Sequence, residues 1–212
     1  DGLRKLLFIH NNGKIYLLNT LLKVQFTGCK TNNKDYFNTI ADGEHIILNK
    51  FKKFENTLAL FDIYYINNKD IRKHNFYNDK TIESTSKTNN EKKSRNQLLI
   101  EFENQISMIP ITKNNKFNLL IKDFYLIKDD EDNDLFNTCK ALLKNIVSNN
   151  YNYETDGIIF TPNNISVGCN DVDEEPRSTR TAWEYSFKWK PPEYNTIDFL
   201  VKIVKDNNDQ DI

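Results

Sequence analysis

The run of residues 58–66, LALFDIYYI, constrains the fold more than any other stretch of the chain. It is almost continuously apolar and rich in aromatic and β-branched side chains. A run of this length and composition predicts a strand that is buried on both faces. The sequence therefore predicts a fold built around a well-covered sheet.

Several other segments predict strands and helices around this run. Asn12-Gly13 separates apolar residues 3–10 from residues 15–18, and Asn-Gly between such runs is the strongest short signal of a β-hairpin. Apolar residues recur at helical spacing in residues 94–107 and again from Leu135. Further strands are expected at residues 45–48, 117–127, 158–160, 181–190 and 196–204. Because strands and helices do not alternate regularly, we expect an α+β fold with antiparallel sheets.

Composition excludes several classes of protein. The 212 residues carry a net charge of -1, so an anion must be held by a local cluster of cations rather than by a basic surface. No apolar run is long enough to span a bilayer. Three widely spaced cysteines indicate neither a disulfide framework nor a zinc site, and they fit a reducing, intracellular compartment. We expect one domain.

Two acidic runs and one polar run are explained without a binding site. The acids at 129–134 directly precede the helix that starts at Leu135, where they complement the helix N-terminus. A metal site is the alternative for these acids. The acids at 171–175 lack the glycine and the spacing of a calcium loop. Residues 81–93 lack the apolar content to order themselves and should form a mobile loop.

Two lysines near the end of the sequence share one side of a predicted strand. In Phe187-Lys188-Trp189-Lys190, side chains alternate between faces, so the ammonium groups point one way and the aromatic rings pack on the other. Pro191 and the proline after it end the strand, and sites often open at strand ends. A solvated face with two lysines is the alternative.

Three Asp-Gly pairs, at Asp1, Asp42 and Asp156, each lead into an apolar run. Each pair alone would indicate a tight turn. Taken with the lysine pair, they resemble motifs of the covalent nucleotidyltransferase superfamily, which comprises mRNA-capping guanylyltransferases and ATP-dependent polynucleotide ligases. The resemblance spans the whole chain, and it implies two antiparallel sheets with flanking helices around a nucleotide cleft.

Five motifs carry this resemblance in the family's order. Asp1-Gly2-Leu3-Arg4 matches the end of the first motif, K-x-D-G-x-R, whose nucleophilic lysine would lie two residues before Asp1. Asp42-Gly43-Glu44 is similar to the third motif. Phe61-Asp62 is similar to the motif that lies between the third and the fourth. Asp156-Gly157-Ile158-Ile159-Phe160 resembles the fourth motif, and Lys188-Trp189-Lys190 the fifth.

The resemblance implies a role for each matching residue. Arg4 and Glu44 would bind the ribose, and Phe61 would stack on the base. Lys190 would contact the α-phosphate, while Lys188 would contact the base edge or the phosphates. Asp156 would hold Mg²⁺ or Mn²⁺. The alternatives are that Arg4 is an ordinary surface cation and that Phe61 is plain core.

Within the superfamily, the chain is most similar to capping enzymes, above all the multifunctional ones of large DNA viruses. Lys-Trp-Lys-Pro followed by Thr-Ile-Asp-Phe, and Asp rather than Glu at position 156, are the features that favour them. The composition, rich in Asn, Lys and Ile, fits an AT-rich viral genome. The alternatives are a ligase-type adenylyltransferase and a binding module without catalysis.

A capping assignment implies the partners and the domain context. GTP would be the substrate, and the 5′-diphosphate end of RNA would accept GMP. Residues 1–212 would form a nucleotidyltransferase domain, with an OB-fold domain after it and triphosphatase and methyltransferase domains as further candidates in the same polypeptide. Without the upstream lysine this segment should form no GMP adduct, because Lys5 should face away from the cleft. His10, His45 and His74 match no motif and are expected to be structural or exposed.

Overall fold

The computed structural model describes residues 2–77, 93–113, 116–127, 134–148, 150–172, 174–176, 183, 185–194 and 196. Three expectations therefore fall wholly or mainly outside the described residues. They are the mobile loop at 81–93, most of the acidic run at 129–134 and the strand expected after Thr196. Asp1 of the first motif lies outside as well.

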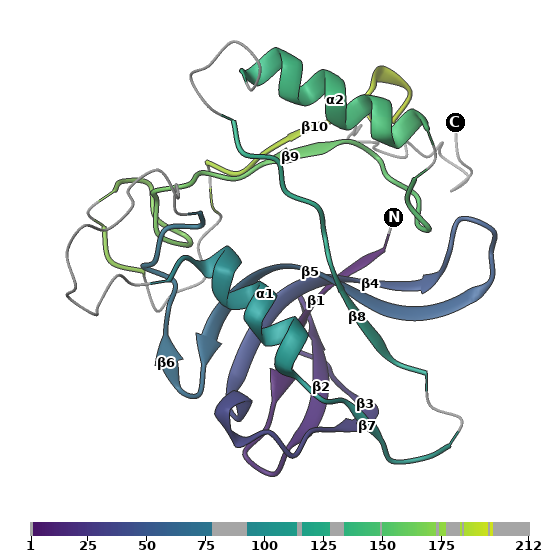
Figure 1. The fold of residues 1–212 in the computed structure, drawn as a ribbon, viewed down its shortest axis with the longest axis vertical. Coiled ribbons are helices and arrows are strands. Elements are labelled where there is room, and N and C mark those ends of the chain that lie inside the picture. The colour runs from purple at the N-terminus through teal and green to yellow at the C-terminus, as the bar shows by residue number, and fades with distance from the viewer. Residues whose placement is uncertain are drawn as a thin grey trace, which may run out of the picture.

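A large sheet forms the body of the molecule (Figure 1). Its strands are β1 (Leu3–Ile9), β2 (Lys14–Asn19), β3 (Val24–Lys30), β4 (Thr39–Leu48), β5 (Phe54–Ile66), β6 (Lys69–Asp70), β7 (Ile109–Pro110) and β8 (Asn118–Ile121). They pair in the order β6-β5-β4-β1-β2-β3-β7, with β8 also on β5. The predicted hairpin is confirmed as β1 and β2.

One helix covers the core face of this sheet. Helix α1 (Arg95–Gln105) starts at Ser94, whose side chain and backbone form a capping box with Gln97, and it contacts β5 and β8. The helix and the sheet share a cluster of fully or almost fully buried side chains. It includes Leu7, Ile9, Ile15, Leu17, Leu58, Leu60 and Ile63 from the sheet and Leu99 and Phe102 from α1. The strand predicted at 58–66 is confirmed as part of β5, which pairs with β4, β6 and β8, and the helix predicted at 94–107 is confirmed.

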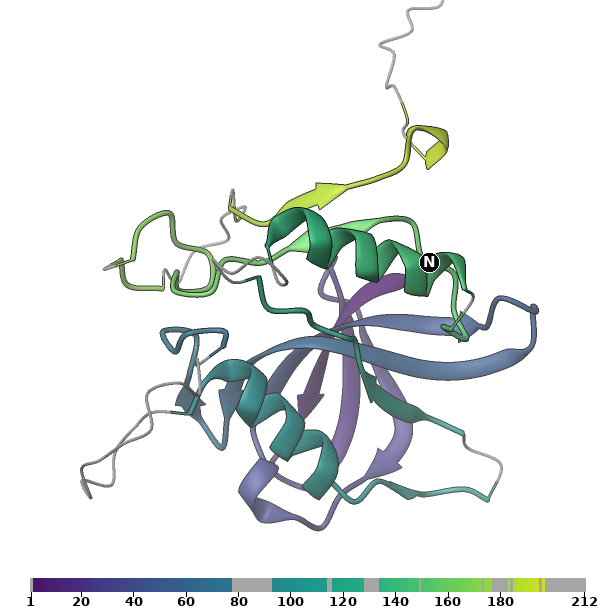
Figure 2. The same cartoon turned by 45° about the horizontal axis from the view of Figure 1, so that its top comes forward.

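A second, smaller layer lies over the end of the large sheet where β1 begins (Figures 1 and 2). It contains helix α2 (Leu135–Val147) and the antiparallel pair β9 (Ile158–Phe160) and β10 (Phe187–Trp189). Asp134 caps α2 by accepting from the backbone N–H of Asn137 at 2.7 Å. Short 3-10 turns occur at Lys34–Tyr36 and Pro192–Tyr194.

The structure corrects three details of the predicted fold. The sheets are mostly antiparallel, but β8 runs parallel to β5. Only Asn118–Ile121 of the strand expected at 117–127 is extended in the sheet, and β10 is shorter than expected. Asp42-Gly43 lies inside β4 rather than in a turn before it. A Cβ at Gly43 would come within 2.9 Å of the Ala59 carbonyl oxygen, so close packing between strands requires this glycine.

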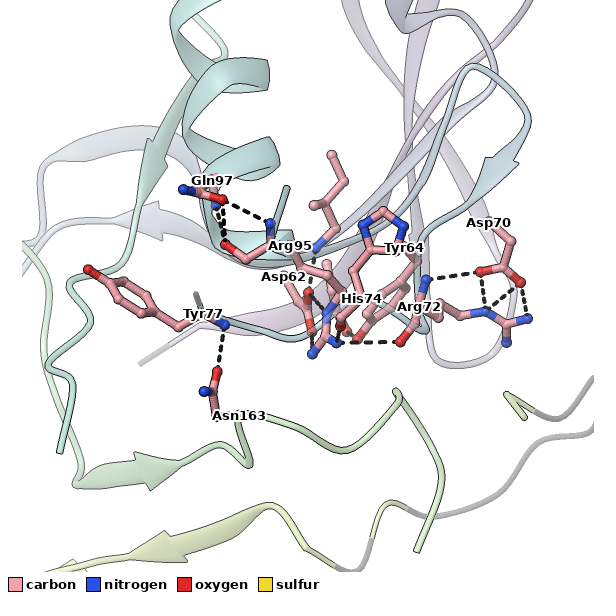
Figure 3. Close-up of polar contacts among 12 residues, drawn as sticks. Asp62, Tyr64, Asp70, Arg72, His74, Tyr77, Arg95, Gln97 and Asn163 are labelled. Atoms are coloured by element: carbon pink, nitrogen blue, oxygen red, sulfur yellow. Dashed lines mark hydrogen bonds and ion pairs between the residues drawn. The ribbon is translucent and has the colours of Figure 1, made fainter. Parts of the chain in front are cut away.

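A buried ion pair joins α1 to β5 (Figure 3). Arg95 donates from Nε to Oδ1 of Asp62 at 2.8 Å and from Nη2 to Oδ2 at 3.2 Å. The Arg95 side chain is fully buried, and its Nη1 also donates to the backbone carbonyls of Arg72 and His74. Asp62 therefore links β5 to α1.

The smaller layer is tied to the large one near this ion pair. Asn163 accepts hydrogen bonds from the backbone N–H of Phe76 at 2.7 Å and of Tyr77 at 2.6 Å, and Figure 3 shows the second of these contacts. The described helices are too short and too polar to cross a membrane. Cys29, Cys139 and Cys169, which all lie in the described part of the chain, are not joined by disulfides.

Candidate functional site

Arg4 and Asp42 form a forked ion pair on the face of the sheet opposite the core. Arg4 Nε lies 3.2 and 3.1 Å from the two carboxylate oxygens of Asp42, and Nη2 lies 2.6 Å from Oδ2. The Tyr64 hydroxyl donates to the same Oδ2 at 2.7 Å. The hydrogen bond to Asp42 raises the pKa of Arg4, although burial opposes it. Asp42 thus fixes the direction of the guanidinium.

Glu44 lies next to this pair on β4 and has two partners of its own. It accepts from the backbone N–H of Gly2 at 2.6 Å through Oε1, and Oε2 pairs with Nζ of Lys122. Burial alone would raise the pKa of Glu44, but the hydrogen bond and the charge of Lys122, together with smaller contributions that include the hydrogen bond from Gly2, outweigh burial and lower the pKa. The carboxylate is therefore held ionised at the surface of the site.

Phe61 extends the same surface from β5. The register between β4 and β5 shifts at this point, with Gly43 opposite Leu60 and Asp42 opposite Asp62, so Phe61 is an additional residue in β5. Such a bulge re-aims a side chain. The Phe61 ring is half-buried, 5.8 Å from Arg4 Cζ and 5.9 Å from Lys122 Nζ. It is not part of the buried core cluster.

Tyr153 connects this surface to the smaller layer. Its ring centroid lies 6.0 Å from Lys122 Nζ. Burial first, and then the charges of Asp123 and Glu44, raise the pKa of Tyr153 to about 12. The phenol therefore stays neutral at ordinary pH, three residues before Asp156 in the sequence.

Asp156 pairs with Lys188 in β10 and with Lys190, the residue that follows β10. Lys188 Nζ and Lys190 Nζ each lie 2.9 Å from its Oδ2. Burial alone would raise the pKa of Asp156, but the hydrogen bonds from Lys188 and Lys190 outweigh it and lower the pKa to about 2. The prediction that both lysines lie on one side of the strand is confirmed. A carboxylate and two ammonium groups thus form a compact cluster with excess positive charge.

Gly157 allows this close approach. Its φ is +152°, and a Cβ there would lie 2.0 Å from the carbonyl oxygen of Trp189. Any side chain would therefore force β9 and β10 apart. The glycine is required by strand packing rather than by a tight turn.

No cluster of three or more His, Cys, Asp or Glu side chains suited to a metal occurs in the described part of the chain. A magnesium ion does not need such a cluster when a substrate is present, because it commonly takes one or two carboxylates and completes its shell with water and phosphate oxygens. The single carboxylate of Asp156 fits that kind of site.

Two expectations about neighbouring residues have opposite outcomes: the one for Phe187 and Trp189 is wrong, and the one for Lys5 is confirmed. Phe187 and Trp189 do not pack into a core, because their exposed fractions are 61% and 42% and β10 pairs with β9 alone among the described strands. Lys5 does face away from Arg4. Its Nζ contacts Gln25 Oε1 at 2.8 Å and His45 Nδ1 at 3.0 Å.

Sequence reasoning missed Lys122 and Tyr153. Lys122 directly follows the apolar residues Leu119, Leu120 and Ile121, and a lone cation at the end of a strand-like run was a usable signal. Tyr153 offered none, because it lies in a polar stretch whose path is set by tertiary contacts. His10 and His74 lie outside this site, and their expected structural or exposed roles stay predictions. His45 is buried, and its Nε2 lies within hydrogen-bond distance of Asn56 Oδ1, at 2.9 Å.

Comparison with known proteins identifies the family of the chain. The family model described as mRNA capping enzyme, catalytic domain, matches residues 1–192. The chain belongs to this family.

Two curated relatives show the same relationship. The chain is 28% identical to the probable mRNA-capping enzyme of Acanthamoeba polyphaga mimivirus over 234 aligned residues, which cover 97% of this chain and 19% of that protein. It is 26% identical to the mRNA-capping enzyme of Caenorhabditis elegans, covering 97% of this chain and 29% of that protein. The chain therefore spans less than a third of the length of either relative.

Proposed function

We propose that this chain is the part of an mRNA-capping guanylyltransferase that binds GTP and stabilises the transfer of GMP. The observation that carries the proposal is the family match over residues 1–192 in a chain whose Lys188 and Lys190 converge on Asp156. The proposal includes a second, OB-fold domain in the same polypeptide.

The surface formed by Arg4, Glu44, Phe61 and Lys122 has the chemistry that a nucleoside requires. An aromatic ring offers a stacking platform for a base. The ionised Glu44 carboxylate can accept hydrogen bonds from ribose hydroxyls, and the Arg4 guanidinium can donate to ribose oxygens. Lys122, beside the Phe61 ring, can donate to a carbonyl oxygen at the edge of a stacked base.

The first step forms a covalent enzyme-GMP intermediate. The neutral amine of the nucleophilic lysine of the first motif would attack the α-phosphorus of GTP, so that a P–N bond forms and the bond from the α-phosphorus to the bridging oxygen breaks. Pyrophosphate leaves with the electron pair of that bond, and the attacking nitrogen releases one proton to solvent. Lys188 and Lys190 would stabilise the negative charge on the phosphates, which is largest in the transition state.

The second step passes GMP to RNA. An oxygen of the terminal phosphate of the RNA 5′-diphosphate attacks the same phosphorus, the P–N bond breaks, and the lysine nitrogen takes up a proton. The same two ammonium groups face the same phosphate, so one cluster serves both steps. A divalent ion held by Asp156 would supply further positive charge at the α-phosphate.

Labelled nucleotides test this proposal directly. The full protein is incubated with α-labelled GTP or ATP and a divalent cation, denatured, and examined for covalently bound label. Label from GTP that chases onto 5′-diphosphate RNA is the expected result. Label from ATP alone would assign the protein to ligase-type chemistry, and no label from either would leave a nucleotide-binding module.

A further inference from the structure

The hairpin that joins β4 to β5 ends in a tip, residues 50–54, that projects from the body of the molecule (Figure 1). The tip has the sequence Lys-Phe-Lys-Lys-Phe, and residues 45–54 contain no acid. Phe51 and Phe54 are each 64% exposed. Two aromatic rings and three lysines are thus presented together, far from the core.

The backbone of this tip is fixed by its own hydrogen bonds. Asn49 Oδ1 accepts from the backbone N–H groups of Phe51 and Lys53, both at 3.0 Å. The backbone of Asn49 also accepts from Lys52 at 2.9 Å and donates to Lys53 at 2.8 Å. The exposed rings therefore stand on an ordered turn.

The β2–β3 hairpin contains the same turn with different side chains. Asn19 Oδ1 accepts from Leu21 N at 3.0 Å and from Lys23 N at 2.9 Å. Leu22 has φ +59°, as Lys52 at the equivalent position has φ +60°. Position for position, Leu21 matches Phe51 and Lys23 matches Lys53. The turn of the β2–β3 hairpin is therefore a matched control for the side chains of the β4–β5 tip.

The surroundings of the tip limit where an anion could lie. Lys50 contacts the carbonyl oxygen of Tyr151, and Lys52 pairs with Glu154 at 3.3 Å between exposed side chains. A pocket of about 310 Å³ at the base of the hairpin is lined by the carboxylates of Glu55 and Asp123 among other residues. Those carboxylates disfavour phosphate in the pocket, so a polyanion is favoured over the tip.

We propose that the tip of the β4–β5 hairpin binds the single-stranded acceptor RNA downstream of its 5′ end, with bases stacked on Phe51 and Phe54 and phosphates near Lys52 and Lys53. Exposed aromatic rings interleaved with cations are the features that bind single strands irrespective of sequence. The identity of the RNA as acceptor rests on the proposed function.

The strands themselves connect this surface to the candidate site. β4 carries Asp42 and Glu44 and then continues to the tip, and β5 returns from the tip to Phe61. Six residues separate Glu44 from Lys50, so the tip lies about 20 Å from the nucleotide surface at the usual strand rise. A dinucleotide acceptor cannot span this distance, whereas a longer RNA can.

Binding of a labelled oligouridylate of about 15 nucleotides to the full protein, measured by fluorescence anisotropy, tests the proposal. Phe51→Ala should weaken binding about tenfold, and Leu21→Ala should not change it. Lys53→Gln should lower the slope of log K against log salt by about 0.7, and Lys23→Gln should leave the slope unchanged. Thermal unfolding establishes that all four variants are folded.

The transfer reaction supplies a second readout that separates this inference from the proposed function. Phe51→Ala should form the enzyme-GMP adduct normally and transfer GMP normally to a diphosphate dinucleotide, but transfer poorly to a longer RNA. Equal RNA binding by Phe51→Ala and the unsubstituted protein would overturn the inference even if GMP transfer occurs. Binding to phosphatidylserine vesicles without binding to RNA would also overturn it. In a further outcome, the unsubstituted protein binds RNA but forms no adduct, while Phe51→Ala loses the RNA binding. That outcome would support the RNA-binding tip and reject the guanylyltransferase assignment.

Discussion

Arg4 binds Asp42 through a guanidinium fork whose shortest contact is 2.6 Å, although the Arg4 side chain is 63% exposed and the Asp42 side chain is fully buried. The buried Asp42 carboxylate thus holds the solvent-facing Arg4 guanidinium in place. Because a fork donates in a fixed plane, the pair determines which way the remaining N–H groups of Arg4 point.

Asp42→Asn should weaken GTP binding about tenfold, because a hydrogen bond between charged groups is worth about 1.5–3 kcal/mol and the guanidinium would lose its orientation. Isothermal titration calorimetry measures the effect. Tyr64→Phe removes the other hydrogen bond to the same carboxylate and leaves the fork in place, so its effect should be smaller. Equal losses in both variants would mean that Asp42 acts only through the fold.

Lys190→Ala should slow adduct formation by about 10²–10³, the usual loss for one electrostatic contact to a transition state. Asp156→Ala should have an effect of similar size, because Asp156 positions both lysines. Single-turnover labelling with GTP measures the rates. Lys5→Ala serves as the control, since Lys5 contacts Gln25 and His45 on the other face of β1. Normal rates in Lys190→Ala would remove Lys190 from the mechanism.

Asp156 should titrate near pH 2, where its pKa is held by Lys188 and Lys190. The folded-state pKa lies below the ordinary value of about 3.9, so the pairing contributes stability above about pH 4 and loses it as the pH falls through about 2. Carbon-detected NMR of labelled aspartate measures the midpoint. The midpoint should rise in Lys190→Ala, and an unchanged midpoint would contradict the pairing.

Phe61→Ala should weaken GTP binding, since stacking a base on an aromatic ring contributes about 1–3 kcal/mol. Phe61→Tyr keeps the ring and is the matched control. Calorimetry of both variants with GTP separates a stacking role from a packing role. A loss of thermal stability in Phe61→Ala without any loss of affinity would assign the ring to packing.

Arg95→Met should lower the free energy of unfolding by about 3–5 kcal/mol, because it leaves the Asp62 carboxylate buried without its partner. Burial already raises the pKa of Asp62, with the charge of Arg95 opposing it. Urea denaturation gives the change in free energy. The double variant Arg95→Met with Asp62→Leu should recover much of the loss, and failure to do so would point to cavity formation instead.

The sequence predicted the elements well where a local pattern is sufficient. The Asn12-Gly13 hairpin, both helices and the shared side of Lys188 and Lys190 follow from turn chemistry and periodicity. Asp42-Gly43 was misread because its glycine is required by the backbone of β5, which no local pattern reports. The insertion of Phe61 was hidden for a similar reason, since an apolar run shows no break where its register shifts.

The motifs anticipated only some of the contacts at the candidate site. Asp156 and the two lysines were found, but the Arg4–Asp42 fork and the Lys122–Glu44 pair depend on which strands become neighbours. Lys122 reaches Glu44 only because β8 adds to β5 in parallel, against the expectation of antiparallel pairing. Tertiary topology, rather than propensity, decided these contacts.

The parallel pairing of β8 with β5 also bears on the order in which the molecule is completed. Strands β1 to β5 pair mainly with neighbours close in sequence, whereas Lys122 is 78 residues from Glu44. Closing so long a loop costs entropy before any contact is gained. During synthesis, strands β1 to β5 can therefore pair while the candidate site still lacks Lys122. Lys188 and Lys190 are added later still. The contacts made by Lys122, Lys188 and Lys190 are therefore the last of the candidate site to form.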